Sequence, residues 1–137
     1  MLIGVRTNPL RLKSKMPELL EWLAANGFTS VDLPEPDADL AARCRRLGLV
    51  PGSVDLPGSA GILSADVERR TAAVRQVREG IQRALDLGLR TWFVCFSPAE
   101  RTQTRGETFA IWRACMPELA ALAEAGEIGR ASCRERV

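Results

Sequence analysis

The 137-residue sequence contains no histidine, and only two of its basic residues, Lys13 and Lys15, are lysines. Histidine is the commonest metal ligand and a frequent general base, so sites that depend on an imidazole are excluded. The formal net charge is only +2, whereas a nucleic-acid-binding surface usually needs a clustered basic face. We therefore expect no nucleic-acid partner.

Long apolar runs and a signal peptide are also missing from the sequence. No run approaches the ~20 apolar residues that span a membrane. Met1 leads directly into an apolar strand pattern, without the basic start that opens a secretory signal. We therefore expect a cytoplasmic protein with no membrane partner.

The cysteines show neither a disulfide pattern nor a metal-binding pattern. There are four of them, and none stands in CxxC spacing. Cys44, Cys95 and Cys115 fall within predicted helices or strands, while Cys133 lies close to the C-terminus. We expect the first three to be buried free thiols.

One unit repeats along the sequence: a helix pattern, a glycine, a short apolar run and a proline. In 87–98, for example, Gly88 ends a helix and Pro98 stops the apolar run at 91–96. The string Val-Asp-Leu-Pro occurs twice, at 31–34 and at 54–57. Glycine suits the left-handed residue that closes a helix, and short apolar runs suit parallel strands covered on both faces. The repeat predicts βαβ units with right-handed crossovers.

The predicted elements follow from this repeat. Strands are expected at 2–7, 29–33, 50–56 and 91–96, and helices at 17–26, 38–47, 65–87 and from residue 107. Asp37 and Ser64 are the predicted caps of the second and third helices. Gly80 is expected to allow close packing, and Pro117 to kink the last helix. The expected inward side chains of the last two helices are Val67, Val74, Val77, Ile81, Leu85, Phe109, Trp112, Cys115, Met116, Leu119 and Leu122.

Four βα units occupy residues 1–126. A complete eight-unit TIM barrel takes ~250 residues, so the count predicts an α/β fold in which a parallel (βα)4 sheet forms half of a TIM barrel. A doubly wound open sheet is the alternative. The dinucleotide-binding version of that fold has no support, because no G-x-G-x-x-G turn follows the first strand.

The last residues, 127–137, do not continue the pattern. Residues 128–137 can be back-translated as ATC GGA AGA GCG TCG TGT AGG GAA AGA GTG, which looks like a sequencing adapter read in frame. We therefore expect 1–126 to be the natural domain and 127–137 to be a non-native tail. A natural polar tail is the alternative.

Three phrases resemble the sugar phosphate isomerase/epimerase family, the xylose-isomerase-like TIM barrels. They are Ile3-Gly4-Val5, the stretch GFTSVDL at 27–33, and Gly48-Leu49 leading to SVDL at 53–56. The segment at 117–126, PELAALAEAG, is similar to the fourth helix of the family. The resemblance implies the N-terminal half of a metal-dependent sugar or sugar phosphate isomerase/epimerase. Such enzymes act by proton abstraction alpha to a carbonyl.

The resemblance also implies a divalent metal (Mn, Mg, Co or Zn) in the full-length enzyme. Its ligands, typically two Glu, an Asp and a His, come from strands five to eight, so we assign no metal ligand and no catalytic residue here. The chain alone is expected to be inactive. The absence of histidine separates it from the apurinic endonucleases and from xylose isomerase proper, which place histidines in the first half of the barrel.

Candidate substrate-binding residues follow the predicted strands, because strand carboxyl ends face the active site of a barrel. Arg6 and Asn8 follow the first strand and are predicted to bind substrate hydroxyls or phosphate, or else to cap a loop. Asp32 and Asp55 occupy equivalent positions, where many relatives carry Glu and His, and are predicted to orient sugar hydroxyls. Turn capping is the alternative for both aspartates.

Ser97 is the remaining candidate, as a hydrogen-bonding partner of the substrate or as a turn residue. Arg101 and Arg105 are interpreted either as a phosphate clamp or as solvated loop residues. The expected ligand is a small-molecule sugar or sugar phosphate. The other function classes are a non-catalytic half-barrel that binds a partner, and a sugar dehydratase or lyase. The first and fourth strands would be open edges, which invite homo-association.

Overall fold

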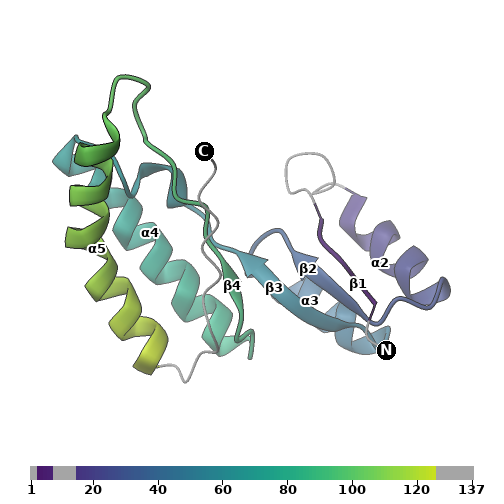
Figure 1. Cartoon of the computed structure of the whole chain (residues 1–137). Coiled ribbons are helices and arrows are strands. Elements are labelled where there is room, and N and C mark those ends of the chain that lie inside the picture. The colour runs from purple at the N-terminus through teal and green to yellow at the C-terminus, as the bar shows by residue number, and fades with distance from the viewer. Residues whose placement is uncertain (1–2, 8–14, 126–137) are drawn as a thin grey trace.

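The computed structural model describes residues 3–7 and 15–125. Strands and helices alternate along the chain (Figure 1). The strands are β1 (Gly4–Val5), β2 (Ser30–Leu33), β3 (Val50–Asp55) and β4 (Trp92–Phe93). The helices are α2 (Met16–Ala25), α3 (Ala38–Arg46), α4 (Val67–Asp86) and α5 (Arg105–Ala125), and a 3-10 helix, η2 (Ser59–Gly61), precedes α4.

The strands form one parallel sheet in the order β1-β2-β3-β4. Every strand therefore pairs with the strand before it in the chain, with helices in the connections. A doubly wound sheet reverses its strand order at a switch point, and no reversal occurs here. The predicted parallel (βα)4 fold is confirmed, with β1 and β4 at the two edges of the sheet.

The hydrophobic core lies between the sheet and the helices. Alternate strand residues point toward the helices and are buried, among them Val31, Leu33, Val54, Leu56 and Trp92. Leucines of α2 and small side chains of α3 and α4 cover them. The other face of the sheet carries Asp32, Asp55 and Phe93, which are only partly buried. The expectation of strands covered on both faces is therefore not met by the described residues.

Glycine ends three of the helices, as the repeat predicts. Gly27, Gly48 and Gly88 follow α2, α3 and α4 with φ of 78°, 71° and 72°, a conformation that costs glycine least. Asp37 caps α3 as expected, and its Oδ1 accepts a hydrogen bond from the Leu40 amide at 2.8 Å.

The start of α4 differs from the prediction. The cap is Asp66, whose Oδ1 accepts from the Arg69 amide at 3.0 Å, and not Ser64. Ser64 is fully buried, and its hydroxyl donates to Glu100 Oε1 at 2.6 Å. Its hydroxyl thus ties the start of α4 to the segment after β4.

Two predicted core residues are exposed, and the two edge strands are shorter than expected. Val67 is 62% exposed because it opens α4 well before Ala73, the first buried residue of that helix. Phe109, predicted to point inward, is 56% exposed on α5. The strands β1 and β4 are the edges of the sheet and have two residues each. The cysteines at 44, 95 and 115 are free thiols as predicted, although only Cys44 is fully buried.

Candidate functional site

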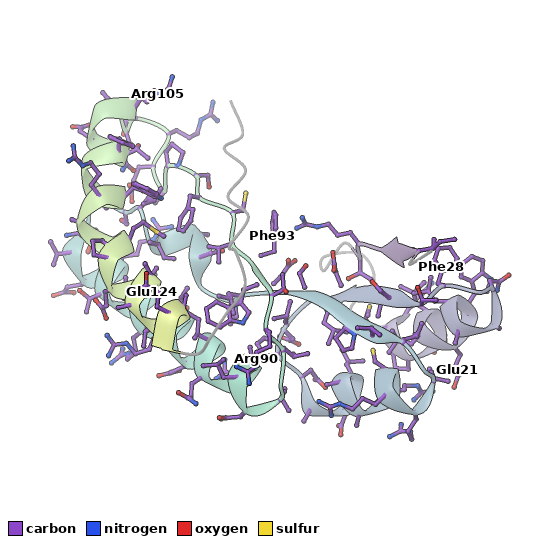
Figure 2. All side chains as sticks on the ribbon, turned by 60° about the horizontal axis from the view of Figure 1, so that its bottom comes forward. Glu21, Phe28, Arg90, Phe93, Arg105 and Glu124 are labelled. Carbon is purple, nitrogen blue, oxygen red and sulfur yellow. The ribbon has the colours of Figure 1, made fainter. Side chains whose placement is uncertain are left out.

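Polar and aromatic side chains gather at the carboxyl end of the sheet. Asp55 and Phe93 are the last residues of β3 and β4 and stand opposite each other in the ladder. Arg6 directly follows β1, and Asp32 is the third residue of β2. Phe93 projects from the sheet face opposite α3 and α4 (Figure 2). We call Arg6, Asp32, Asp55 and Phe93 the carboxyl-end cluster.

Arg6 connects one edge of the sheet to the other. Its Nη2 lies 3.5 Å from Asp55 Oδ1, and its Cζ lies 3.5 Å from the centre of the Phe93 ring. In a flat sheet β1 and β4 would be roughly 14 Å apart, three strand spacings. The Arg6 and Phe93 side chains reach toward each other across the sheet face opposite the helices, which we call the concave face because it is the inner face of a half-barrel sheet.

Asp32 holds a β-bulge in β3. Val31 pairs with Pro51 but Leu33 pairs with Val54, so β3 contains one residue more than β2 in this interval. Such a bulge leaves a backbone group of the longer strand unpaired. Asp32 Oδ1 accepts a hydrogen bond from the Ser53 amide at 2.7 Å. The carboxylate thus satisfies a donor that the ladder does not.

The bulge determines where Asp55 points. Side chains alternate between the two faces of a strand, and one extra residue exchanges the faces of every residue after it. Val54 and Leu56 are buried against the helices, which leaves Asp55 on the concave face beside Arg6. Without the bulge, Asp55 would point into the apolar core.

Charge and burial act on Asp55 in opposite directions. Its side chain is 21% exposed and that of Arg6 is 48% exposed. Burial raises the pKa of Asp55 above its usual 3.8, the Arg6 guanidinium lowers it, and the neighbouring Asp32 carboxylate raises it again. Burial is the largest of the three effects, so the net shift is upward.

The cluster does not fit a divalent metal. Within residues 3–7 and 15–125, no three His, Cys, Asp or Glu side chains gather as a possible ligand set. Of the two carboxylates in the cluster, one accepts from the Ser53 amide and the other pairs with a guanidinium. Catalytic zinc needs at least three protein ligands, and magnesium, which keeps several waters, still needs a carboxylate that is not already bound to a backbone amide or a guanidinium.

The structure thus brings together three of the residues predicted from sequence: Arg6, Asp32 and Asp55. Ser97 is exposed in the segment after β4, and its substrate-binding role stays a prediction. Asn8 lies outside the described residues. Phe93 was not identified from the sequence. Alternation along β4 could have indicated it, since the neighbouring Trp92 is only 6% exposed and faces the core.

No protein-family model matches the sequence, and no curated protein matches it. Solved structures match closely in shape. An L-ribulose 3-epimerase superposes with a TM-score of 0.71 at 23% identity, covering 98% of this chain and 49% of that one. A 3-keto-D-glucoside 4-epimerase from E. coli superposes with a TM-score of 0.74 at 13% identity, and the match covers 97% of this chain and 55% of that one. The chain has the fold of half a TIM barrel.

A D-psicose 3-epimerase from Clostridium cellulolyticum, solved with D-tagatose, also matches this half-barrel over half of its own length. Its TM-score is 0.74 at 16% identity, and the match covers 93% of this chain and 50% of that one. The half-barrel therefore spans about half the length of the solved chains that it matches. In the part of the chain that the structure describes, no helix has the length and apolar character needed to cross a bilayer.

Proposed function

We propose that this chain is the N-terminal half of a sugar isomerase or epimerase that removes the proton alpha to a carbonyl. The observation that carries the proposal is the Arg6–Asp55 pair on the concave face, 3.5 Å apart. It lies at the carboxyl ends of the strands, where TIM-barrel enzymes bind their substrates. The three epimerases of the same fold support the reaction class.

The cluster is suited to holding a sugar. Asp55 accepts hydrogen bonds from sugar hydroxyls, Arg6 donates to a hydroxyl or carbonyl oxygen, and the Phe93 ring offers an apolar surface. Arg6 is already paired with Asp55 and placed over Phe93, so its charge is largely compensated. With one guanidinium against two carboxylates, the cluster favours an unphosphorylated sugar over a sugar phosphate.

The base and the divalent metal (Mn, Mg, Co or Zn) belong, in this proposal, to the second half of the enzyme. The described residues do not fit a metal, so this half binds and orients the substrate and does not carry the proton transfer. The proposal includes a natural continuation after residue 126 in place of the tail at 127–137. The isolated chain is then a binding half without turnover.

The test begins with the source DNA beyond codon 126, which should encode four further βα units. The full-length enzyme, loaded with Mn²⁺ in D₂O, should introduce deuterium at the carbon alpha to the carbonyl of L-ribulose or D-psicose, measured by ¹H NMR. An epimer should accumulate; loss of water from the sugar would instead indicate a dehydratase. The 137-residue chain is the matched control and should exchange nothing. A reading frame without a second half, or a full-length enzyme inert toward ketoses, would contradict the proposal.

A further inference from the structure

The first helix of the half-barrel carries an exposed aromatic side chain on its outer flank. Met16, Leu20 and Leu23 form the buried stripe of α2. On one side of this stripe Glu21 Oε1 pairs with Arg43 Nη2 of α3 at 2.5 Å. By helical spacing, Trp22 falls on the other side, away from α3, where it is 56% exposed.

The last helix, α5, also has an ion pair to its neighbouring helix on one side and an exposed aromatic side chain on the other. Glu118 of α5 forms an ion pair with Arg78 of α4. Half a turn away by helical spacing, Phe109 points away from α4 and is 56% exposed. Its ring stacks on Trp112, with centroids 5.7 Å apart and an interplanar angle of 8°. Each end helix thus presents an aromatic surface where no described helix covers it.

The sheet is also open at both places. The strands β1 and β4 are the two edges, and an edge strand presents unpaired N–H and C=O groups. Figure 1 shows α2 and α5 at opposite ends of the molecule, each beyond one edge strand. The Phe28 ring lies beside Trp22, with centroids 5.9 Å apart. We call β1 with Glu18, Trp22 and Phe28 the α2 end, and β4 with Phe109, Trp112 and Arg113 the α5 end.

The two ends are complementary in charge. On α2, Glu18 stands four residues before Trp22, so the two share one side of the helix. On α5, Arg113 stands four residues after Phe109, with its guanidinium carbon 6.0 Å from the ring centre. The α2 end therefore carries an aromatic ring with an acid, and Lys15 one turn earlier on the same side, while the α5 end carries an aromatic ring with a base.

We propose that two copies of this chain dock, with the α2 end of each against the α5 end of the other. A two-fold axis makes both contacts identical and closes the assembly. Strand β4 of each copy then pairs in parallel with β1 of the other copy, which gives a closed barrel of eight strands. Two copies supply the length of the solved barrels, of which one copy covers 49% to 55% in three cases. The inference concerns the isolated chain and does not rest on the proposed function, in which the second half of the enzyme would occupy the same two ends.

Sedimentation equilibrium of the 137-residue chain tests the docking. The expected mass is twice the 15.0 kDa of one chain. A monomer at about 100 µM, above the dissociation constant of a micromolar dimer, would overturn the proposal, and so would an open series of higher oligomers.

Charge exchange tests which surfaces meet. E18R and R113E should each weaken the dimer about tenfold, and the double variant E18R/R113E should restore it. E79R, on the exposed side of α4, is the matched control and should leave association unchanged. Circular dichroism identifies any variant that fails to fold, and W22S then provides a second, charge-independent probe that should also weaken the dimer. Single charge variants or a folded W22S that dimerise as well as the parent chain would overturn the proposed contact.

Discussion

Arg6 and Asp55 meet across β2, with Arg6 Nη2 3.5 Å from Asp55 Oδ1. Their strands are two positions apart in the sheet, and in a flat sheet two strand spacings would separate them by roughly 10 Å. The long arginine side chain covers this distance, and the bulge in β3 directs Asp55 toward the same face of the sheet. The Arg6–Asp55 pair therefore depends both on the bulge in the β3 backbone and on the opposite charges of the two side chains.

The pKa of Asp55 should respond in opposite directions to two substitutions. Asp32→Asn removes a neighbouring negative charge and should lower it, whereas Arg6→Met removes a favourable positive charge and should raise it. Carboxyl ¹³C shifts followed through a pH titration measure both changes. Glu107, whose pKa is lowered by hydrogen bonds from Thr104, is the internal control and should titrate as before. If the pKa of Asp55 is unchanged in both variants, the charges of Asp32 and Arg6 do not act on Asp55.

Asp55 should make the folded state less stable as pH rises. Its folded-state pKa lies above the 3.8 of the free side chain, so between these two values the folded state binds more protons than the unfolded state. The stability contributed by the protonated carboxyl is present below 3.8 and is lost as pH rises through the folded pKa. The variant Asp55→Asn should lack this decline. Thermal unfolding between about pH 3 and about pH 7 measures it, and an equal decline in the variant would assign it to other groups.

The bulge in β3 should depend on the acceptor at position 32. Asp32→Ala leaves the Ser53 amide without its partner at 2.7 Å and should cost about 1–3 kcal/mol of unfolding free energy. Asp32→Asn keeps an acceptor oxygen and should cost less, which makes it the matched control. Urea unfolding gives the energies, and amide hydrogen exchange should speed up at Ser53 in the alanine variant only. Equal losses in the two variants would indicate that charge, and not the hydrogen bond, holds the bulge.

Two glycines in helices should respond differently to alanine. A Cβ at Gly80 in α4 would lie 3.1 Å from Pro57 Cδ and 3.4 Å from Leu56 Cδ2, whereas a Cβ at Gly106 in α5 would meet nothing within 4 Å. Alanine is favoured over glycine within helices by about 0.5–1 kcal/mol. Gly106→Ala should therefore raise stability by up to that amount, while crowding should cancel or reverse the gain for Gly80→Ala. Denaturant midpoints compare the two, and a larger gain at position 80 would contradict the close packing.

Much of the fold could be predicted because the residues that begin and end its helices act locally. Gly27, Gly48 and Gly88 end helices for a conformational reason that each residue carries by itself. The same holds for the Asp37 cap. The close packing expected at Gly80 is also confirmed, since Leu56 and Pro57 leave little room for a side chain.

The remaining features depend on contacts between distant segments, which local patterns do not reveal. The repeated Val-Asp-Leu-Pro string makes Asp32 and Asp55 look equivalent, yet the carboxylate of Asp32 serves the β3 backbone and that of Asp55 faces Arg6. Ser64 and Asp66 are both good caps by residue type, but α4 begins only at Val67, and the buried Ser64 hydroxyl donates a hydrogen bond to Glu100. Phe109 follows the helical period only loosely, and its exposure depends on where α4 lies.

The sequential strand order also bears on how the chain is made. Each strand pairs with the strand before it in the chain. Every strand after the first therefore has a pairing partner that is synthesised before it. Domains form from the N-terminus as synthesis proceeds, at roughly 5–20 residues per second. The nascent sheet can thus grow one strand at a time in the order of translation, with its newest strand always the exposed one.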